Sequence, residues 1–191
     1  MMGYMKILFL LVALILTLTT HAKTNLEIIK IGHPTLRATA QEVIHAEISN
    51  PEFQSLIDDM ISTMGEAGGV GLAAPQVNKS LRIFVMKSWP GVSLTVVINP
   101  TIEYLEDFGK KDSVEGCLSI PGKNLKVQRF KKIHLSYFDR KGEYISVELN
   151  GFGAIIAQHE YDHLNGILIV DLVEQMISKI NYIGFSNAPL M

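Results

Sequence analysis

The residues best suited to chemistry form one short segment near the C-terminal end, His159-Glu160-Tyr161-Asp162-His163. On a helix, residues four apart share one face, so His159 and His163 can bind the same metal ion. Glu160 projects nearby, where its carboxylate can take a proton from a water molecule on that ion. The H-E-x-x-H pattern therefore predicts metal-assisted hydrolysis of an amide.

A catalytic site of this kind needs a third protein ligand, because three side chains usually hold the ion and leave one position open. Two familiar placements fail here: Ile169 stands where a third histidine would follow, and Glu174, the only later glutamate, lies close after His163. Upstream, Cys117 is the candidate, since a thiolate binds zinc or ferrous iron strongly and Gly116 permits close backbone approach. The alternative for a lone cysteine is a small buried hydrophobe.

A third segment, from Gly69 to Gln76, reads GVGLAAPQ. Glycines and alanines let a backbone pass close to a ligand, and the Gln76 amide can both donate and accept hydrogen bonds. A tight turn leading into a buried strand explains the same sequence equally well. Alone, the segment does not assign a site.

The composition fits one globular domain. The chain has 191 residues, of which 48% are hydrophobic, enough for a sizeable core. Its formal net charge of −2 provides no basic footprint, so we expect no nucleic-acid partner. Cys117 is the single cysteine, which excludes an internal disulfide.

The first 22 residues have the layout of a secretory signal peptide. One lysine precedes an almost unbroken apolar run from Ile7 to Leu18, and Ala22 offers a small residue for cleavage. The run is short for a membrane span, so we expect no stable span once the leader is removed. We predict export, with 1–22 as the leader and 23–191 as a single catalytic domain. A misassigned start or an uncleaved hydrophobic tail is the alternative.

Hydrophobic periodicity predicts helices on both sides of a central group of strands. Apolar residues recur at helical spacing from Pro51 to Met64, with Asn50 as the N-cap, and a second helix from Gly153 to Leu164 carries the H-E-x-x-H segment. Strands are expected at 81–86, 94–98, 126–139 and 144–149, and a terminal helix at 173–180. Asn99-Pro100 should stop the second strand. This order favours an α+β fold over a parallel βαβ sheet.

Taken in order, the three segments resemble the peptide deformylase family. The match comprises GVGLAAPQ from Gly69, EGCLS from Glu115 and QHEYDHLNG from Gln158. Flanking sequence agrees, because Ile31–Arg37 resembles the family's opening segment and Tyr137–Gly142 resembles its hairpin. The resemblance leaves out the leader and roughly the last twenty residues. It implies small antiparallel or mixed β-sheets packed around a central helix carrying H-E-x-x-H.

The resemblance implies an enzyme that removes the formyl group from the N-terminal formyl-methionine of new polypeptides and releases formate. Its implied metal ligands are Cys117, His159 and His163. The bound ion is divalent, typically Fe²⁺ in the family. Glu160 would act as general base and then as general acid, while Gln76 and the backbone N–H of Leu118 would stabilise the oxyanion.

The implied substrate contacts come from the same segments. The backbone of Gly69, Val70 and Gly71 would hold the peptide in extended form, in the manner of an added strand. Ile155 and Ile156 would form part of an apolar pocket for the methionine side chain. The expected partners are formyl-methionyl peptides or nascent chains, and we expect a monomer.

The leader and the resemblance disagree about the compartment, because the family is cytoplasmic by default. Ferrous iron and its thiolate ligand are easily oxidised outside the cytoplasm, so Zn²⁺ is favoured if the protein is exported. Two other functions stay open. One is a small zinc peptidase or amidase on the same scaffold, and the other is a catalytically silent exported protein that binds metal or peptide.

Some residues differ from the family's pattern, and others are assigned no chemical role. Lys123 and Asn124 follow Pro-Gly where many members carry an arginine, which leaves substrate affinity beyond the methionine open. Arg129 is interpreted as a structural arginine of a strand, and Asp162 as facing solvent or supporting its helix. For Glu115, hydrogen bonding to a loop and simple solvation are both open.

Overall fold

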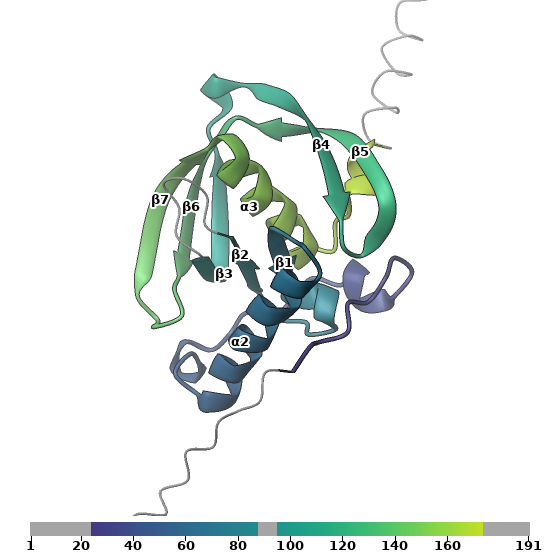
Figure 1. The fold of residues 1–191 in the computed structure, drawn as a ribbon. Helices are drawn as coiled ribbons and strands as arrows, with labels where there is room; N and C mark the ends of the chain where they lie inside the picture. The colour runs from purple at the N-terminus through teal and green to yellow at the C-terminus, as the bar shows by residue number, and fades with distance from the viewer. Residues whose placement is uncertain (1–23, 88–94, 174–191) are drawn as a thin grey trace, which may run out of the picture.

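The computed structural model describes residues 24–87 and 95–173 (Figure 1). Its helices are α2 (Pro51–Glu66) and α3 (Gly151–Leu164), with 3-10 turns η1 (Pro34–Arg37), η2 (His45–Glu47), η3 (Ala74–Val77) and η4 (Glu106–Phe108). Its strands are β1 (Gly71–Ala73), β2 (Ile83–Met86), β3 (Thr95–Tyr104), β4 (Lys110–Cys117), β5 (Ile120–Phe130), β6 (Lys132–Phe138) and β7 (Tyr144–Asn150). The leader at 1–22 and, except for its first residue, the terminal helix at 173–180 lie outside the described residues. No helix within the described ranges is long and apolar enough to cross a membrane.

Two antiparallel sheets lie around helix α3. Strands β1-β2-β3-β6-β7 form the larger sheet in that order, and β4 and β5 form a separate two-stranded sheet. Helix α3 contacts strands of both, and Figure 1 shows it between the larger sheet and the β4–β5 ribbon. The predicted α+β fold, with small sheets packed around the H-E-x-x-H helix, is confirmed.

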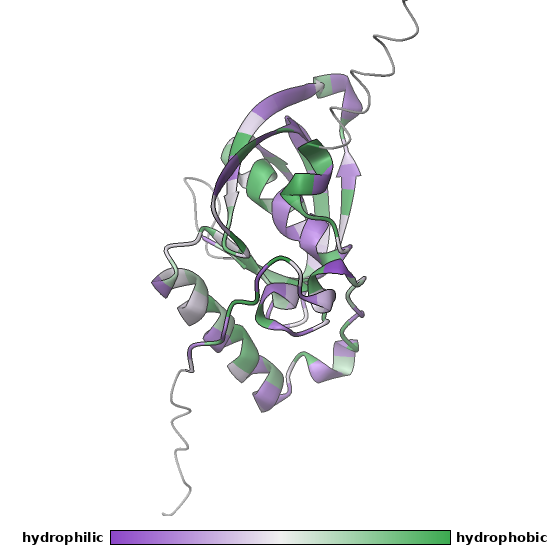
Figure 2. Ribbon diagram, turned by 90° about the vertical axis from the view of Figure 1, so that its right-hand side faces the viewer, coloured by the Kyte–Doolittle hydropathy of each residue, from purple (hydrophilic) through white to green (hydrophobic). Residues whose placement is uncertain are grey.

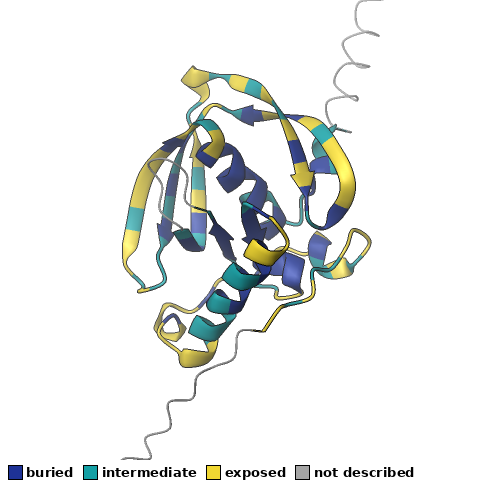
Figure 3. Ribbon diagram, viewed as in Figure 1, coloured by how far each residue is buried: buried dark blue, intermediate teal, exposed yellow. Residues whose placement is uncertain are grey.

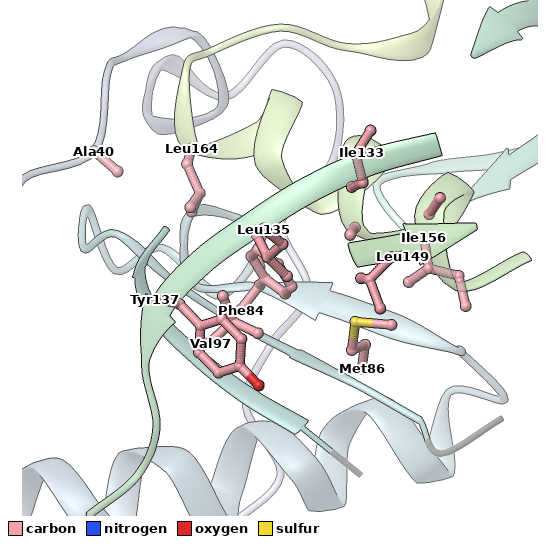
Figure 4. Packing of buried hydrophobic residues seen from close by; sticks show 13 residues of the cluster. Ala40, Phe84, Met86, Val97, Ile133, Leu135, Tyr137, Leu149, Ile156 and Leu164 are labelled. Carbon is pink, nitrogen blue, oxygen red and sulfur yellow. The ribbon is translucent and has the colours of Figure 1, made fainter. Parts of the chain in front are cut away.

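Helix α3 is buried along most of its length (Figure 3). Small residues at Gly153, Ala154 and Ala157 let its backbone approach the sheets closely. Ile156 and Leu164 join a core with Phe84, Leu135 and other apolar side chains of β2, β3 and β6 (Figure 4). Each large apolar side chain buried in this way stabilises the fold by about 1.5–3 kcal/mol. Figure 2 shows that the same helix also carries hydrophilic residues, which the core holds out of solvent.

Helix α2 begins as predicted and runs two residues further. The Asn50 side chain accepts a hydrogen bond from the Glu52 N–H at 2.9 Å, which satisfies an otherwise unpaired donor of the first turn. Its buried face places Ile57, Met60 and Met64 in a second core cluster beneath β1 and β2. This packing supports the short strand β1 from outside the larger sheet.

The strand expected to stop at Asn99 continues as β3 to Tyr104, so that boundary was wrong. The ladder with β6 shifts register between Ile98 and Thr101, and this irregularity accommodates the proline that cannot donate to it. Asn99 adopts a left-handed backbone with φ of 49°. Its side chain exchanges two hydrogen bonds with the Val43 backbone, each 2.8 Å long, which offset the cost of that conformation.

The single strand expected over 126–139 was also wrong. It is two strands, β5 and β6, which belong to different sheets and separate at Lys131. No glycine or proline lies at the boundary between β5 and β6. The alternation of apolar and polar residues alone therefore gives no signal that one strand ends there. The expected pairing of β6 with β7 is confirmed, with Phe138 opposite Tyr144 at the hairpin end. Strand β4, the partner of β5, was not anticipated.

Candidate metal centre and active site

The three predicted metal ligands come together at the meeting point of β4 and α3. Cys117 is the last residue of β4, and His159 and His163 lie one helical turn apart on α3. The Cys117 Sγ lies 3.3 Å from Nε2 of His163, and the three ligand atoms lie within 4.8 Å of one another. One thiolate and two imidazoles fit a zinc or ferrous ion and leave a coordination position open.

A buried chain of charges fixes the orientation of His159. Its Nδ1 lies 2.9 Å from Oε2 of Glu115, so the Nδ1–H donates to that carboxylate and leaves Nε2 for an ion. The guanidinium of Arg129 donates to both oxygens of Glu115, at 2.9 Å each, and also to Asp162 at 2.5 Å. Strands β4 and β5 are thereby tied to α3 beside the ligands.

These contacts shift the ionisation of the groups involved. Burial opposes the charge on Glu115, but hydrogen bonds from Arg129 and His159 lower its pKa to about 2. Burial likewise opposes the charge on Arg129, yet its bonds to Glu115 and its pairing with Asp162 raise the pKa above its usual value. Burial lowers the pKa of His163 well below its usual value, which leaves this imidazole neutral and able to bind a metal.

The sequence reasoning missed the function of this chain of charges. Glu115 is not solvated but 6% exposed, and it contacts His159, a predicted metal ligand, directly. Arg129 is structural, as expected, but its contact reaches the site through Glu115. Asp162 supports its helix through Arg129 rather than facing solvent. The one available signal was the position of Glu115, two residues before Cys117 on the same strand and therefore on the same face.

Glu160 is buried beside the predicted ligands. Burial raises its pKa to about 7, and its Oε2 has no hydrogen-bond partner among the described residues. A side chain at Gly71 would place its Cβ 2.3 Å from the other oxygen, Oε1. The absence of a side chain at Gly71 therefore provides the space that Glu160 occupies. A buried carboxylate of this kind is suited to accept and return a proton near neutral pH.

The Gln76 side chain is held with its amide nitrogen toward the ligands. Its Oε1 accepts a hydrogen bond from the Ala73 N–H at 2.8 Å, which fixes which end of the amide faces the site. Its Nε2 lies 3.7 Å from Cys117 Sγ and 3.3 Å from Ser119 Oγ. Gln76 thus presents an amide donor toward the predicted ligand Cys117.

A cavity of about 670 Å³ opens beside these groups. All the predicted substrate-contacting residues line it: Gly69, Val70, Gly71, Ile155 and Ile156. Leu118, Gln76, Cys117, His159 and Glu160 line it as well. The wall also includes Lys30, Val114 and Phe152, which sequence reasoning did not assign. The segment from Pro121 to Asn124, where Lys123 and Asn124 stand in place of the family's arginine, lines the cavity too.

A family model described as polypeptide deformylase matches residues 25–179. The chain belongs to the polypeptide deformylase family. It is 47% identical over 156 residues to the peptide deformylase of Halothermothrix orenii, covering 80% of this chain and 98% of that relative. The corresponding values for Fusobacterium nucleatum peptide deformylase are 43% over 151 residues, with 79% and 85% covered. Members of this family are metal-dependent hydrolases that remove the N-formyl group from nascent peptides, and the chain is an enzyme of that kind, a peptide deformylase.

Solved deformylase structures share the fold. The enzyme from Thermotoga maritima superposes with a TM-score of 0.72 at 40% identity, covering 78% of this chain and 97% of that one. A Met-Ala-Ser-bound class I type b peptide deformylase from Acinetobacter baumannii gives 0.74 at 34% identity, with 79% and 99% covered. The deformylase architecture thus spans the described residues that hold the site.

The contact between Gly71 and Glu160 predicts a sharp effect of one methyl group. Gly71→Ala should displace the Glu160 carboxylate and lower formate release from a formyl-methionyl peptide about 100-fold or more, because small misplacements near the reacting groups are costly. Metal content, measured by elemental analysis, should stay unchanged. Gly65→Ala is the matched control, since a Cβ there meets nothing within 4 Å. Full turnover by Gly71→Ala would contradict the assigned contact.

The hydrogen bond from His159 to Glu115 predicts weaker metal binding when the carboxylate is neutralised. Glu115→Gln should lower metal affinity about 10- to 100-fold, as loss of a partner behind a metal-ligating histidine typically does. Competition with a chelator of known affinity measures it. Glu148→Gln is the control. It removes an exposed carboxylate of β7 that pairs with Lys132 of β6, and it should leave metal affinity unchanged. Equal affinities for both variants would refute the role of Glu115.

Proposed function

We propose that, when this chain hydrolyses the formyl amide of formyl-methionyl peptides, Cys117, His159 and His163 act as metal ligands and Glu160 acts as the general base. A single observation carries the proposal. Cys117, His159 and the buried Glu160, which has an unpaired oxygen, line one cavity, and the ligand atom of His163 lies within 4.8 Å of the other two donors. A protein that only bound metal or peptide would not need this carboxylate, whose burial without a partner opposes folding.

The donor set supports one divalent ion. When bound, such an ion polarises a carbonyl oxygen and lowers the pKa of a coordinated water to about 7. The chain's own part is to orient the donors and to keep His163 in its neutral form. Glu115 and Arg129 hold His159 with Nε2 toward the site, and burial keeps His163 neutral.

Glu160 moves the proton in the proposed reaction. As a carboxylate it accepts a proton from the attacking water, and as a carboxylic acid it returns that proton to the departing peptide amine. Its burial raises its pKa to about 7, so both forms are accessible near neutral pH. Gly71 leaves the carboxylate room beside the cavity. The products are formate and a peptide with a free N-terminal methionine.

Two donors of the chain are assigned to the oxyanion that forms at the formyl carbon. Gln76 offers its Nε2–H, and its rotation is prevented by the Ala73 N–H bonded to Oε1. The backbone N–H of Leu118 follows directly after the ligand Cys117. Removal of one such preorganised donor typically costs about 100- to 1000-fold in turnover.

The peptide is assigned to other parts of the wall of the same cavity. Strand β1 lies at an edge of the larger sheet, so the Gly69–Gly71 backbone can pair with an extended peptide as an added strand. The side chains of Ile155 and Ile156 offer an apolar surface to the flexible methionine side chain. The expected monomer stays a prediction.

Turnover by Glu160→Gln tests the proton-transfer role. Formate release should fall about 100- to 10,000-fold, the usual contribution of a general base, while metal content stays that of the wild type. Glu143→Gln, in the exposed hairpin between β6 and β7, is the matched control. An unformylated methionyl peptide belongs in the same assay. If the enzyme cleaved the backbone of that peptide and released no formate from the formylated one, the peptidase alternative would be favoured.

We further propose that the leader directs export and that the exported protein holds zinc. The support is chemical, because the thiolate of Cys117 and a ferrous ion are both open to oxidation outside the cytoplasm, whereas zinc has no redox chemistry. Cell fractionation, followed by elemental analysis of the protein from the exported fraction, should find one zinc per chain. Stoichiometric iron in that fraction would overturn the zinc assignment. A cytoplasmic protein with its leader intact would overturn export.

A further inference from the structure

Two lysines supply the exposed charges of the cavity wall within the described ranges. Lys30 comes from the segment before η1, and Lys123 from β5. The other charged groups in the wall, Glu115 and Glu160, are buried, and Arg129 neutralises the first of them. We propose that Lys30 and Lys123 form a cationic rim that selects peptides carrying a carboxylate a short distance after the formyl-methionine.

Lys30 is held in place before any peptide arrives. Its Nζ donates to the backbone carbonyl of Leu118 at 3.0 Å, and an ammonium group has two further N–H donors. The flanking backbone is fixed as well, because Ile29 N–H donates to the Gln76 carbonyl and Ile31 N–H to the Ser119 carbonyl, both at 2.9 Å. The Lys30 ammonium group therefore has a fixed position beside the proposed oxyanion donors.

Lys123 reaches the same cavity from the small sheet. Its neighbour Asn124 pairs with Gly116 in the β4–β5 ladder, so this part of β5 is fixed next to the ligand Cys117. In the part of the chain that the structure describes, neither Lys30 nor Lys123 pairs with a carboxylate. Both ammonium groups can therefore meet an anion of the substrate.

The acidic residues closest in sequence to the wall do not cancel this rim. Glu27, Glu66 and Asp112 are not part of the cavity lining. Asn25 donates a hydrogen bond to Glu66, and Lys126 pairs with Asp112. The rim is therefore positive on a chain whose formal net charge is −2. The local charge of the rim is opposite in sign to the net charge of the chain. Anions are therefore favoured at this rim and not over the whole surface.

The two lysines determine how strongly kcat/KM should depend on a substrate carboxylate and how far from the formyl-methionine that carboxylate can lie. Exposed ion pairs are individually weak, so two lysines should raise kcat/KM for a peptide with a well-placed carboxylate about 3- to 10-fold. An extended peptide advances about 3.3 Å per residue, and charges are screened beyond about 8 Å at physiological salt. A carboxylate two or three residues too far along should therefore lose the preference. A free C-terminal carboxylate and an acidic side chain are the two sources of this chemistry.

The inference rests on the proposed function, and a peptide series tests it on the metal-loaded enzyme. Formyl-methionyl oligoalanines of increasing length, each made as free acid and as C-terminal amide, should show an acid-to-amide ratio of kcat/KM above one at short lengths. The ratio should approach one as the peptide lengthens or as salt is raised. Amidated peptides with aspartate or asparagine at successive positions test the side-chain source. A preference in either arm supports the rim and identifies the source.

Variants decide whether the lysines cause the preference. Lys123→Glu should bring the ratio below one, and Lys30→Gln should reduce it toward one. Lys131→Glu makes the same charge change as the first variant, outside the cavity wall, and should keep the wild-type ratio. A ratio of one at every length in both peptide arms at low salt, or one unaltered by Lys123→Glu, would overturn the inference. Absence of formate release from every peptide would instead refute the proposed function.

Discussion

The buried ion pair between Arg129 and Glu115 joins the small sheet to the helix that carries the chemistry. Arg129 lies on β5, Glu115 on the paired strand β4, and their contacts continue to Asp162 and His159 on α3. Loss of one partner would leave a buried charge uncompensated, which typically costs about 3–5 kcal/mol. The pair therefore holds β4 at one position relative to α3, and with it the thiol of Cys117 relative to the two imidazoles.

A steric constraint acts beside this electrostatic one. Helix α3 can approach the larger sheet because its inner face carries glycine and alanine where the strands lie close. At the level of β1, the missing side chain of Gly71 becomes the space for Glu160. The same edge strand is the proposed binding surface for the peptide. In the proposed reaction, this short strand leaves room for Glu160 as the general base and pairs with the peptide at its outer edge, so common backbone would bring the base and the scissile amide together.

Prediction from sequence succeeded where the relevant geometry is local. His159, Glu160 and His163 share a helix, and helical spacing alone places them together. Prediction failed where the chain changes sheets without a turn residue, as at Lys131, and where a bulge absorbs the proline after Asn99. Arg129 and Asp162 were not linked to the site because charged residues at such positions usually face solvent, and only their pairing between the small sheet and helix α3 withdraws them from solvent.

The residues themselves determined the kind of chemistry: an H-E-x-x-H helix, one cysteine available as third ligand, and a glycine-rich segment ending in Gln76. These donors have fixed chemical properties in any fold. The tertiary structure decided which of them meet. Cys117 lies 46 residues from His163 along the chain, yet their ligand atoms are 3.3 Å apart. It also decided that Lys30 and Lys123 face one cavity. Contacts between distant segments depend on packing and strand pairing, which no local pattern records.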